Sequence, residues 1–137
     1  MQLFKNFCDY TLDKNGVLEK FELKYPDDYN FGYDVVDEMA KCAPNDIAVQ
    51  WTNVHNERKT FTFSDIATLS NKAANALRNN GVKKGDKVLV ILKRNYEYWY
   101  IVFALHKLGA VGIPATNMLT LDDITYRIET ANIKFAV

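Results

Sequence analysis

The second half of the chain alternates between strand-like and helix-like stretches, and this alternation constrains the fold more than any other feature. Strand-like runs occupy residues 87–92, 111–115 and 133–137, and helical patterns occupy 96–108 and 120–131 between them. Continuously apolar strands joined by helices of this length are typical of a parallel sheet covered on both faces. The sequence therefore predicts an α/β fold with a βαβαβ parallel-sheet unit covered by helices.

The residues before this unit predict a helix and a β-hairpin. The helix fits residues 31–43, with Asn30 as its N-cap and apolar residues at spacings of three and four. Two β-rich runs at 47–52 and 59–63 are joined by the polar stretch 53–58, which favours a hairpin.

A second helix is expected directly after the hairpin. Ser64 is a candidate N-cap, and Gly81 supplies the left-handed residue that commonly closes such a helix. Its apolar positions follow the 3.6-residue period, namely Ile66, Leu69, Ala73, Ala76 and Leu77. In contrast, residues 1–30 show no sustained period, and we interpret them as an N-terminal arm, part helical, lying across a surface.

Composition bounds the class of protein. The chain has 137 residues, with 48% hydrophobic and 25% charged residues, which fits one soluble globular domain and argues against disorder. Seventeen basic residues balance 17 acidic ones, so the electrostatic attraction on which nucleic-acid binding depends is missing. We expect no nucleic-acid partner.

The location of the protein is also predicted from the sequence. The first 13 residues lack the apolar run of a secretory signal, which predicts a cytoplasmic protein. The strongly apolar stretch 98–105 is far shorter than the roughly 20 residues of a membrane-spanning helix, so no membrane span is expected. Cys8 and Cys42 lack CxxC spacing and are interpreted as free thiols.

No motif in the chain predicts catalytic chemistry. The turn 92–96 between the first strand and its helix has no glycine, and no GxxxxGK[ST] loop occurs. Gly109 is explained as a helix C-cap, and Arg94 is better explained as a solvated turn residue than as an anion ligand. His55 and His106 lack a positioned nucleophile or carboxylate at motif spacing. We therefore expect no catalytic residue and no metal site within these residues.

The aromatic residues around Trp99 leave two interpretations open. Tyr96, Tyr98 and Tyr100 flank this tryptophan and could form a stacking surface for a base or cofactor. Core packing of a helix that is apolar almost all round is the favoured interpretation.

Three segments resemble the core motifs of the adenylate-forming, or AMP-binding, enzymes. They are K-T-F-T-F-S-D-I at 59–66, G-V-K-K-G-D-K-V at 81–88 and L-H-K-L-G-A-V-G-I-P-A-T at 105–116. Their order and spacing match those of the family over about residues 30–137.

Shorter phrases are most similar to the medium-chain acyl-CoA synthetases. They include N-F-x-x-D-V around Asn30 to Val35, K-A-A-N at 72–75 and D-I-x-Y-R at 123–127. The resemblance implies that residues 31–137 form a truncated N-terminal subdomain of an AMP-binding synthetase or ligase, preceded by the arm at 1–30.

The resemblance also implies a reaction for the complete enzyme. A carboxylic acid substrate attacks the α-phosphate of ATP with Mg²⁺ to form an acyl-adenylate, and coenzyme A then displaces AMP to form the thioester. The phosphate loop with its lysine, the ribose-binding aspartate and the lysine of the C-terminal lid lie downstream in the family. We therefore expect a chain that is inactive alone, binds none of these cofactors alone, and has the remainder of the synthetase polypeptide as its partner.

One loop is a candidate binding site. Thr116, Asn117 and Met118 leave the carboxyl end of a strand, where open α/β sheets bind ligands. The resemblance places the corresponding loop near the coenzyme A nucleotide, although family members often carry glycines there and this chain does not. An ordinary strand-to-helix loop is the alternative.

The sequence leaves more than one interpretation of the whole chain open. Val137 falls inside or just after an expected strand, which predicts the opening segment of a longer protein. The alternative is a non-catalytic binding or interaction module that retains the scaffold. A flavodoxin-like carrier is disfavoured because the expected phosphate-binding turns lack Gly, Ser and Thr.

Overall fold

The parallel sheet is the centre of the computed structural model, which describes residues 3–137. Its strands are β5 (Lys87–Val90), β6 (Val111–Pro114) and β7 (Phe135–Ala136), in the spatial order β6-β5-β7. Both pairings are parallel, with Val88 opposite Gly112 in β6 and opposite Phe135 in β7. The predicted βαβαβ unit is thereby confirmed.

Two helices connect these strands. Helix α3 (Glu97–Leu108) joins β5 to β6, and α4 (Leu121–Ala131) joins β6 to β7. Gly109 ends α3 in the left-handed conformation with φ of 64°, as its assignment as a C-cap predicts. Thr120 and Asp123 form a reciprocal capping box at the start of α4, because each side chain accepts a hydrogen bond from the other's backbone amide.

The predicted second helix begins two residues earlier than expected. Helix α2 (Phe63–Asn79) has Thr62 as its N-cap, and the Thr62 hydroxyl and Asp65 carboxylate form a capping box. Ser64 lies inside the helix, so its assignment as N-cap is wrong. The reason is that Asp65 stands three residues after Thr62, which is the spacing that the reciprocal bonds require. Gly81 has a φ of 93°, as expected for the residue after this helix.

The first helix and the central hairpin are also present. Strands β3 (Ile47–Thr52) and β4 (Arg58–Thr62) pair antiparallel. Before them, the helical stretch consists of a π-helical segment, η2 (Phe31–Asp37), followed by α1 (Glu38–Cys42). The side chain of Asn30 accepts a hydrogen bond from the Gly32 amide, which confirms the predicted cap.

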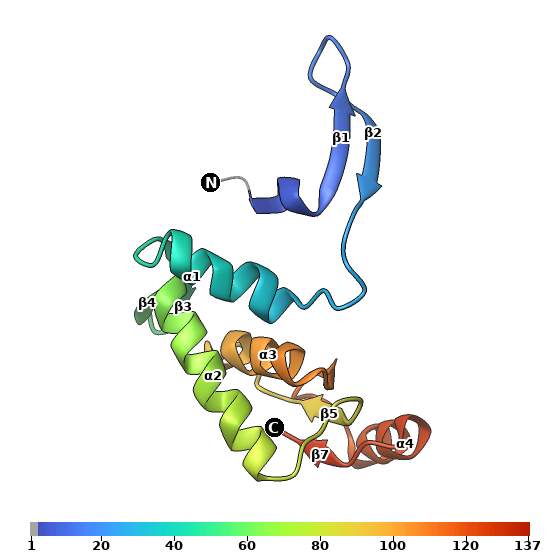
Figure 1. The fold of residues 1–137 in the computed structure, drawn as a ribbon. Helices are drawn as coiled ribbons and strands as arrows, with labels where there is room; N and C mark the ends of the chain where they lie inside the picture. The colour runs from blue at the N-terminus through green and yellow to red at the C-terminus, as the bar shows by residue number, and fades with distance from the viewer. Residues whose placement is uncertain (1–2) are drawn as a thin grey trace.

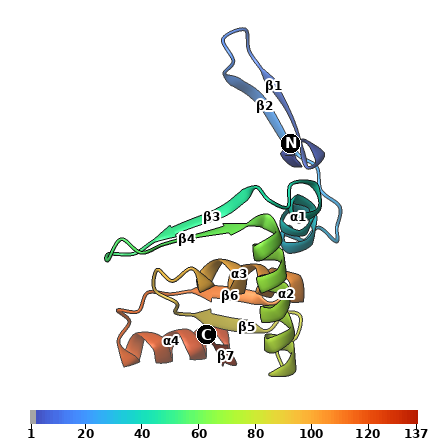
Figure 2. The same cartoon turned by 90° about the vertical axis from the view of Figure 1, so that its left-hand side faces the viewer.

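The N-terminal arm contains a hairpin that the sequence analysis missed. A short 3-10 helix, η1 (Leu3–Asn6), is followed by strands β1 (Cys8–Leu12) and β2 (Leu18–Leu23), which pair antiparallel. Thus the arm is helical only at its start, and Figures 1 and 2 show the hairpin projecting away from the sheet rather than lying across it. Residues 1 and 2 of the expected arm lie outside the described residues.

The turn of this hairpin explains why the two strands pair. The Asp13 carboxylate accepts hydrogen bonds from the amides of Asn15 at 2.8 Å and Val17 at 2.9 Å. Gly16 follows with a φ of 80°, a conformation that glycine adopts without steric cost. These bonds lower the pKa of Asp13, the amide of Val17 contributing most. The sequence signal for the turn was therefore the Asp-x-Asn-Gly stretch.

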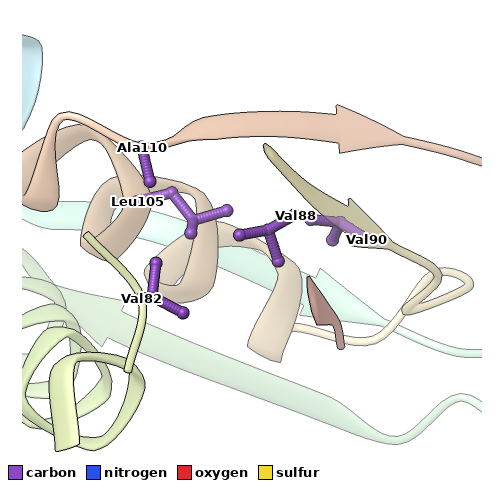
Figure 3. Close-up of a cluster of buried hydrophobic side chains, with 5 residues drawn as sticks. All are labelled: Val82, Val88, Val90, Leu105 and Ala110. Atoms are coloured by element: carbon purple, nitrogen blue, oxygen red, sulfur yellow. The ribbon is translucent and has the colours of Figure 1, made fainter. Parts of the chain in front are cut away.

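The core lies between the sheet, α3 and the segment after α2. Figure 3 shows Val88 and Val90 of β5 with Leu105 of α3, and Val82 and Ala110 beside them. Val88 is fully buried and Leu105 is 1% exposed. Burying such side chains stabilises the fold by roughly 1.5 to 3 kcal/mol each.

The two faces of the sheet are covered unequally. Figure 1 shows α2 and α4 on opposite sides of β5 and β7. Helix α4 has no buried residue, and Leu121 and Tyr126 on it are 78% and 66% exposed. The prediction of helices on both faces holds, but α4 protects its face much less than α2 and α3 protect theirs.

The assignment of the core predicts that the same change, leucine to alanine, affects the free energy of unfolding very differently at two positions. Leu105→Ala removes buried methyl groups and leaves a cavity, and we expect a loss of about 3 kcal/mol in the free energy of unfolding. Leu121→Ala changes an exposed leucine, and we expect a change below about 0.5 kcal/mol. Urea denaturation followed by circular dichroism measures both, and equal effects would contradict the assignment of the core.

Candidate functional site

The carboxyl edge of the parallel sheet brings together two loops. Because β5 and β6 are parallel, the loop at 91–96 and the loop at 115–120 leave the same edge, and Figure 2 shows both arrows pointing to it. The Val90 carbonyl accepts a hydrogen bond from the Ala115 amide at 2.9 Å, so the loops start side by side. The chain then passes from β6 to β7 on the other side of β5. This reversal is a topological switch point, where open α/β sheets bind ligands.

The predicted candidate loop lies at this edge. The Thr116 hydroxyl accepts a hydrogen bond from the Met118 amide at 3.2 Å, which forms a tight turn directly after β6. Thr116 and Asn117 are exposed, and Met118 is 83% exposed. The loop therefore presents a hydroxyl, an amide and a thioether to solvent, groups that can contact the polar and apolar parts of a nucleotide.

The loop after β5 is held by the central hairpin. The Trp51 indole donates a hydrogen bond to the Arg94 carbonyl at 2.6 Å. Lys93, the preceding residue, has a φ of 50°, which is uncommon for a residue with a side chain. The side chain of Arg94 is exposed, in agreement with its interpretation as a solvated turn residue.

An aromatic cluster supports the start of α3. The Tyr96 ring contacts Trp51 and Phe61 at centroid distances of 5.3 and 5.2 Å. The Lys59 amine donates a hydrogen bond to the Tyr96 hydroxyl at 2.7 Å and lies 4.1 Å from its ring centroid. This hydrogen bond raises the pKa of Lys59. Tyr96 is thus a packing residue, as expected if the aromatic residues around Trp99 pack in the core. Trp99 itself is 45% exposed, so core packing does not describe it.

A buried lysine joins three helical segments, and sequence reasoning missed it. The Lys107 side chain of α3 is 1% exposed, and its amine donates hydrogen bonds to Asp37 of η2 at 2.6 Å and to two residues of α2. These are Ser70, 2.9 Å from the amine, and Asn71, at 2.7 Å. An ammonium group has three donors, so all of them are used.

Two sequence signals could have revealed this lysine. Ser70 falls among the apolar positions of α2, and Lys107 falls in an otherwise apolar helix. Gly32 belongs to the same contact, because a Cβ atom at this position would lie only 2.7 Å from the Lys107 Cγ. A glycine, a serine and a lysine at inward positions thus belong to one buried contact.

The two histidines lie in different environments, His106 in an aromatic contact and His55 in an exposed turn. His106 packs edge-on against Phe31 and near Phe103, and burial lowers the pKa of its imidazole. Its backbone carbonyl accepts a hydrogen bond from the Asn30 side chain at 2.6 Å, which ties the end of α3 to η2. His55 lies in the turn between β3 and β4. Within residues 3–137 no group of three His, Cys, Asp or Glu side chains could hold a metal ion.

Comparison with known proteins identifies the family. The model of the AMP-binding enzyme family matches residues 36–137, which is most of the chain. The chain therefore belongs to the AMP-binding enzymes.

Relatives with curated descriptions refine this result. The chain is 35% identical over 133 residues to the mitochondrial acyl-coenzyme A synthetase ACSM4 of Rattus norvegicus, covering 93% of this chain and 23% of that protein. It is 35% identical over the same length to the mitochondrial acyl-coenzyme A synthetase ACSM3 of Homo sapiens. The chain thus spans about a quarter of the length of these relatives, and it matches their N-terminal part.

Solved structures agree on the fold. The N-terminal subdomain of NpsA from Klebsiella oxytoca superposes with a TM-score of 0.68 and 25% identity, over 76% of this chain and 26% of that chain. An acyl-CoA synthetase from Brucella canis gives a TM-score of 0.74 at 23% identity, over 79% of this chain and 20% of that one. The chain therefore has the fold of part of the N-terminal subdomain of adenylate-forming enzymes. No helix among the described residues is long and apolar enough to cross a membrane.

The buried lysine predicts a specific pattern of stability. Lys107→Met leaves the Asp37 carboxylate without its cation, and we expect a loss of about 3 kcal/mol in the free energy of unfolding. The double variant Lys107→Met/Asp37→Asn should recover part of this loss, because no unpaired charge remains. Lys41→Met breaks an exposed pair with Glu38 and should cost less than about 1 kcal/mol. A double variant less stable than the single Lys107 variant would contradict this role, and urea denaturation measures all three.

The lowered pKa of His106 predicts a dependence of stability on pH. A histidine whose folded-state pKa lies below its unfolded value near 6.5 binds protons more readily when unfolded. Stability from this group is therefore present above pH 6.5 and lost as the pH falls through the lower folded-state value. We expect His106→Gln to flatten the decline in stability below pH 6.5. A pKa at or above 6.5 for His106 in an NMR titration would contradict the prediction.

Proposed function

We propose that this chain is the N-terminal part of an acyl-CoA synthetase that forms an acyl-adenylate from ATP and a carboxylic acid and then transfers the acyl group to coenzyme A. The observation that carries the proposal is the match to the N-terminal part of acyl-CoA synthetases over nearly the whole chain. In this proposal residues 31–137 form the subdomain scaffold, residues 1–30 form an arm, and the rest of the synthetase is the partner.

The described residues do not fit ATP and Mg²⁺. The loops at 91–96 and 115–120 lack the glycines that let a backbone wrap a phosphate chain. No carboxylate cluster for a divalent cation lies within the described part of the chain. We therefore assign neither the adenylation chemistry nor metal binding to these residues, and we propose that the chain alone is inactive.

The Thr116-Asn117-Met118 loop fits a contact with coenzyme A better. It is exposed, it lies at the switch point of the sheet, and it offers a hydroxyl and an amide for hydrogen bonds. In this proposal the loop helps to orient the nucleotide end of coenzyme A, and the thiol at the other end of the same molecule reacts away from the loop. Coenzyme A supplies the thiol that attacks the acyl-adenylate and releases AMP.

The location of the protein stays a prediction from the sequence. We propose a cytoplasmic location, whereas the names of ACSM3 and ACSM4 assign those relatives to mitochondria. Subcellular fractionation of cells that express a C-terminally tagged protein tests this part of the proposal, and recovery in a mitochondrial fraction would contradict it.

Thioester synthesis tests the function directly. Residues 1–137 and the longest polypeptide encoded by their reading frame are each assayed with ATP, Mg²⁺, coenzyme A and fatty acids of increasing length. We expect acyl-CoA from the long polypeptide alone. Acyl-CoA from residues 1–137 would contradict the proposed inactivity, and a long polypeptide that makes none with any acid would favour the alternative, a non-catalytic interaction module.

The proposed coenzyme A loop predicts a selective kinetic defect. In the long polypeptide we expect Thr116→Val to raise the KM for coenzyme A several-fold while the KM for ATP stays the same. Thr125→Val is a matched control, because Thr125 is also exposed but lies on α4. An unchanged KM for coenzyme A in the Thr116 variant would contradict the assignment of the loop.

A further inference from the structure

The hairpin formed by β1 and β2 is strongly two-faced. Cys8 pairs with Leu23 and Tyr10 with Phe21, so these side chains lie on one face. The residues between them pair in the same way and are charged or polar on the opposite face, namely Asp9, Thr11, Lys20 and Glu22. The hairpin therefore has one apolar face, formed by Cys8, Tyr10, Leu12, Phe21 and Leu23, and one solvated face.

The apolar face is covered only in part within residues 3–137, because Cys8 is buried and Tyr10 packs against Phe4 at a ring-centroid distance of 5.8 Å. Leu12 is 50% exposed, Phe21 54% and Leu23 61%. Figure 2 shows that the hairpin extends away from the sheet and its helices. A two-stranded hairpin in water is marginally stable without packing on another element. Leu12, Phe21 and Leu23 therefore leave apolar surface that packing on another element would stabilise.

The base of the hairpin is hollowed. A groove of about 330 Å³ lies between η1, the hairpin and η2, and its lining includes Phe4, Phe7, Phe21, Leu23 and Val35. The lining is almost entirely apolar, so the groove fits apolar side chains rather than a polar ligand. The apolar face and this groove form one continuous surface because Phe21 and Leu23 belong to both.

The size of the surface argues against a second copy of the chain as its occupant. Strands β1 and β2 have five and six residues, and strands of this length span a hairpin face on the order of 200 Å², to which the groove adds only its own opening. A stable dimer buries about 800 Å² on each partner. A segment of the same polypeptide pays no such association cost, so a small apolar surface suffices for it.

The comparisons point to the same occupant. The family model begins at residue 36, but the alignment with ACSM4 covers 93% of the chain and so includes most of residues 1–35. These relatives extend far beyond the matched part, since the chain covers 23% of ACSM4. Hence most of the segment before residue 36 aligns with much longer acyl-CoA synthetases.

We propose that the apolar face of the β1–β2 hairpin and the groove at its base dock an apolar segment of the polypeptide that follows residue 137. This proposal rests on the proposed function, because that function supplies the downstream polypeptide. The hairpin then packs the N-terminal arm against the remainder of the synthetase through its apolar face, and its charged face stays in solvent.

Hydrogen exchange measured by mass spectrometry tests the docking. In residues 1–137 alone we expect the amides of Cys8–Leu12 and Leu18–Leu23 to exchange rapidly. In the longest polypeptide encoded by the reading frame we expect them to exchange at least tenfold more slowly, independently of protein concentration. Equal exchange in the two polypeptides, or a reading frame that stops after codon 137, would overturn the proposal. Protection that appears only at high concentration would also overturn it, because it indicates a second copy.

A matched pair of variants identifies the face. Phe21→Ser in the long polypeptide should abolish the protection, whereas Lys20→Ser, on the opposite face of the same strand, should leave it unchanged. Equal effects of the two variants would overturn the proposal. A long polypeptide with a protected hairpin and no acyl-CoA synthesis supports the docking and refutes the proposed function, so the two failures are distinguishable.

Discussion

The buried amine of Lys107 is the contact on which the arrangement of the helices depends. Taking an ammonium group out of water costs several kcal/mol, and acceptors at 2.6, 2.7 and 2.9 Å on η2 and α2 offset this cost. Lys107 and Leu105 lie two residues apart and therefore on different faces of α3, so the helix packs against η2 and α2 through one face and against β5 through another. Gly32 allows η2 to approach closely enough for this contact. One charged group thus fixes three segments that are distant in the sequence.

The position of α3 determines the geometry of the carboxyl edge of the sheet. The loop at 91–96 leads into α3, and the contacts of Tyr96 and Trp51 hold that loop under the central hairpin. The second loop, at 115–120, starts beside it through the bond between Ala115 and Val90. These contacts set the geometry of the edge that carries the loop proposed to contact coenzyme A. The arrangement agrees with the proposal that residues 31–137 are a scaffold and that other parts of the enzyme complete the chemistry.

The sequence predicted most of the elements that depend on local periodicity, and it missed one local hairpin and a buried contact between residues that are distant in the sequence. The βαβαβ unit, the central hairpin and the cap at Asn30 follow from patterns within a few residues. The first hairpin was missed because the alternation is strict only in β1 and breaks in β2, where the register also shifts, although Asp13 to Gly16 carried a turn signal. The contact of Lys107 joins residues 37 and 70 positions apart, and no local pattern reports such a distance. The candidate loop was located correctly at the sheet edge, but its ligand came only from the family resemblance.

We propose that residues 1–137 are a scaffold without a nucleotide site of their own. Isothermal titration calorimetry of residues 1–137 with ATP and Mg²⁺, and then with coenzyme A, tests it most directly. We expect no heat of binding for ATP at millimolar concentration and none for coenzyme A. Tight binding of ATP to this chain alone, at micromolar concentration, would contradict the account and would show that residues 1–137 form a complete nucleotide site.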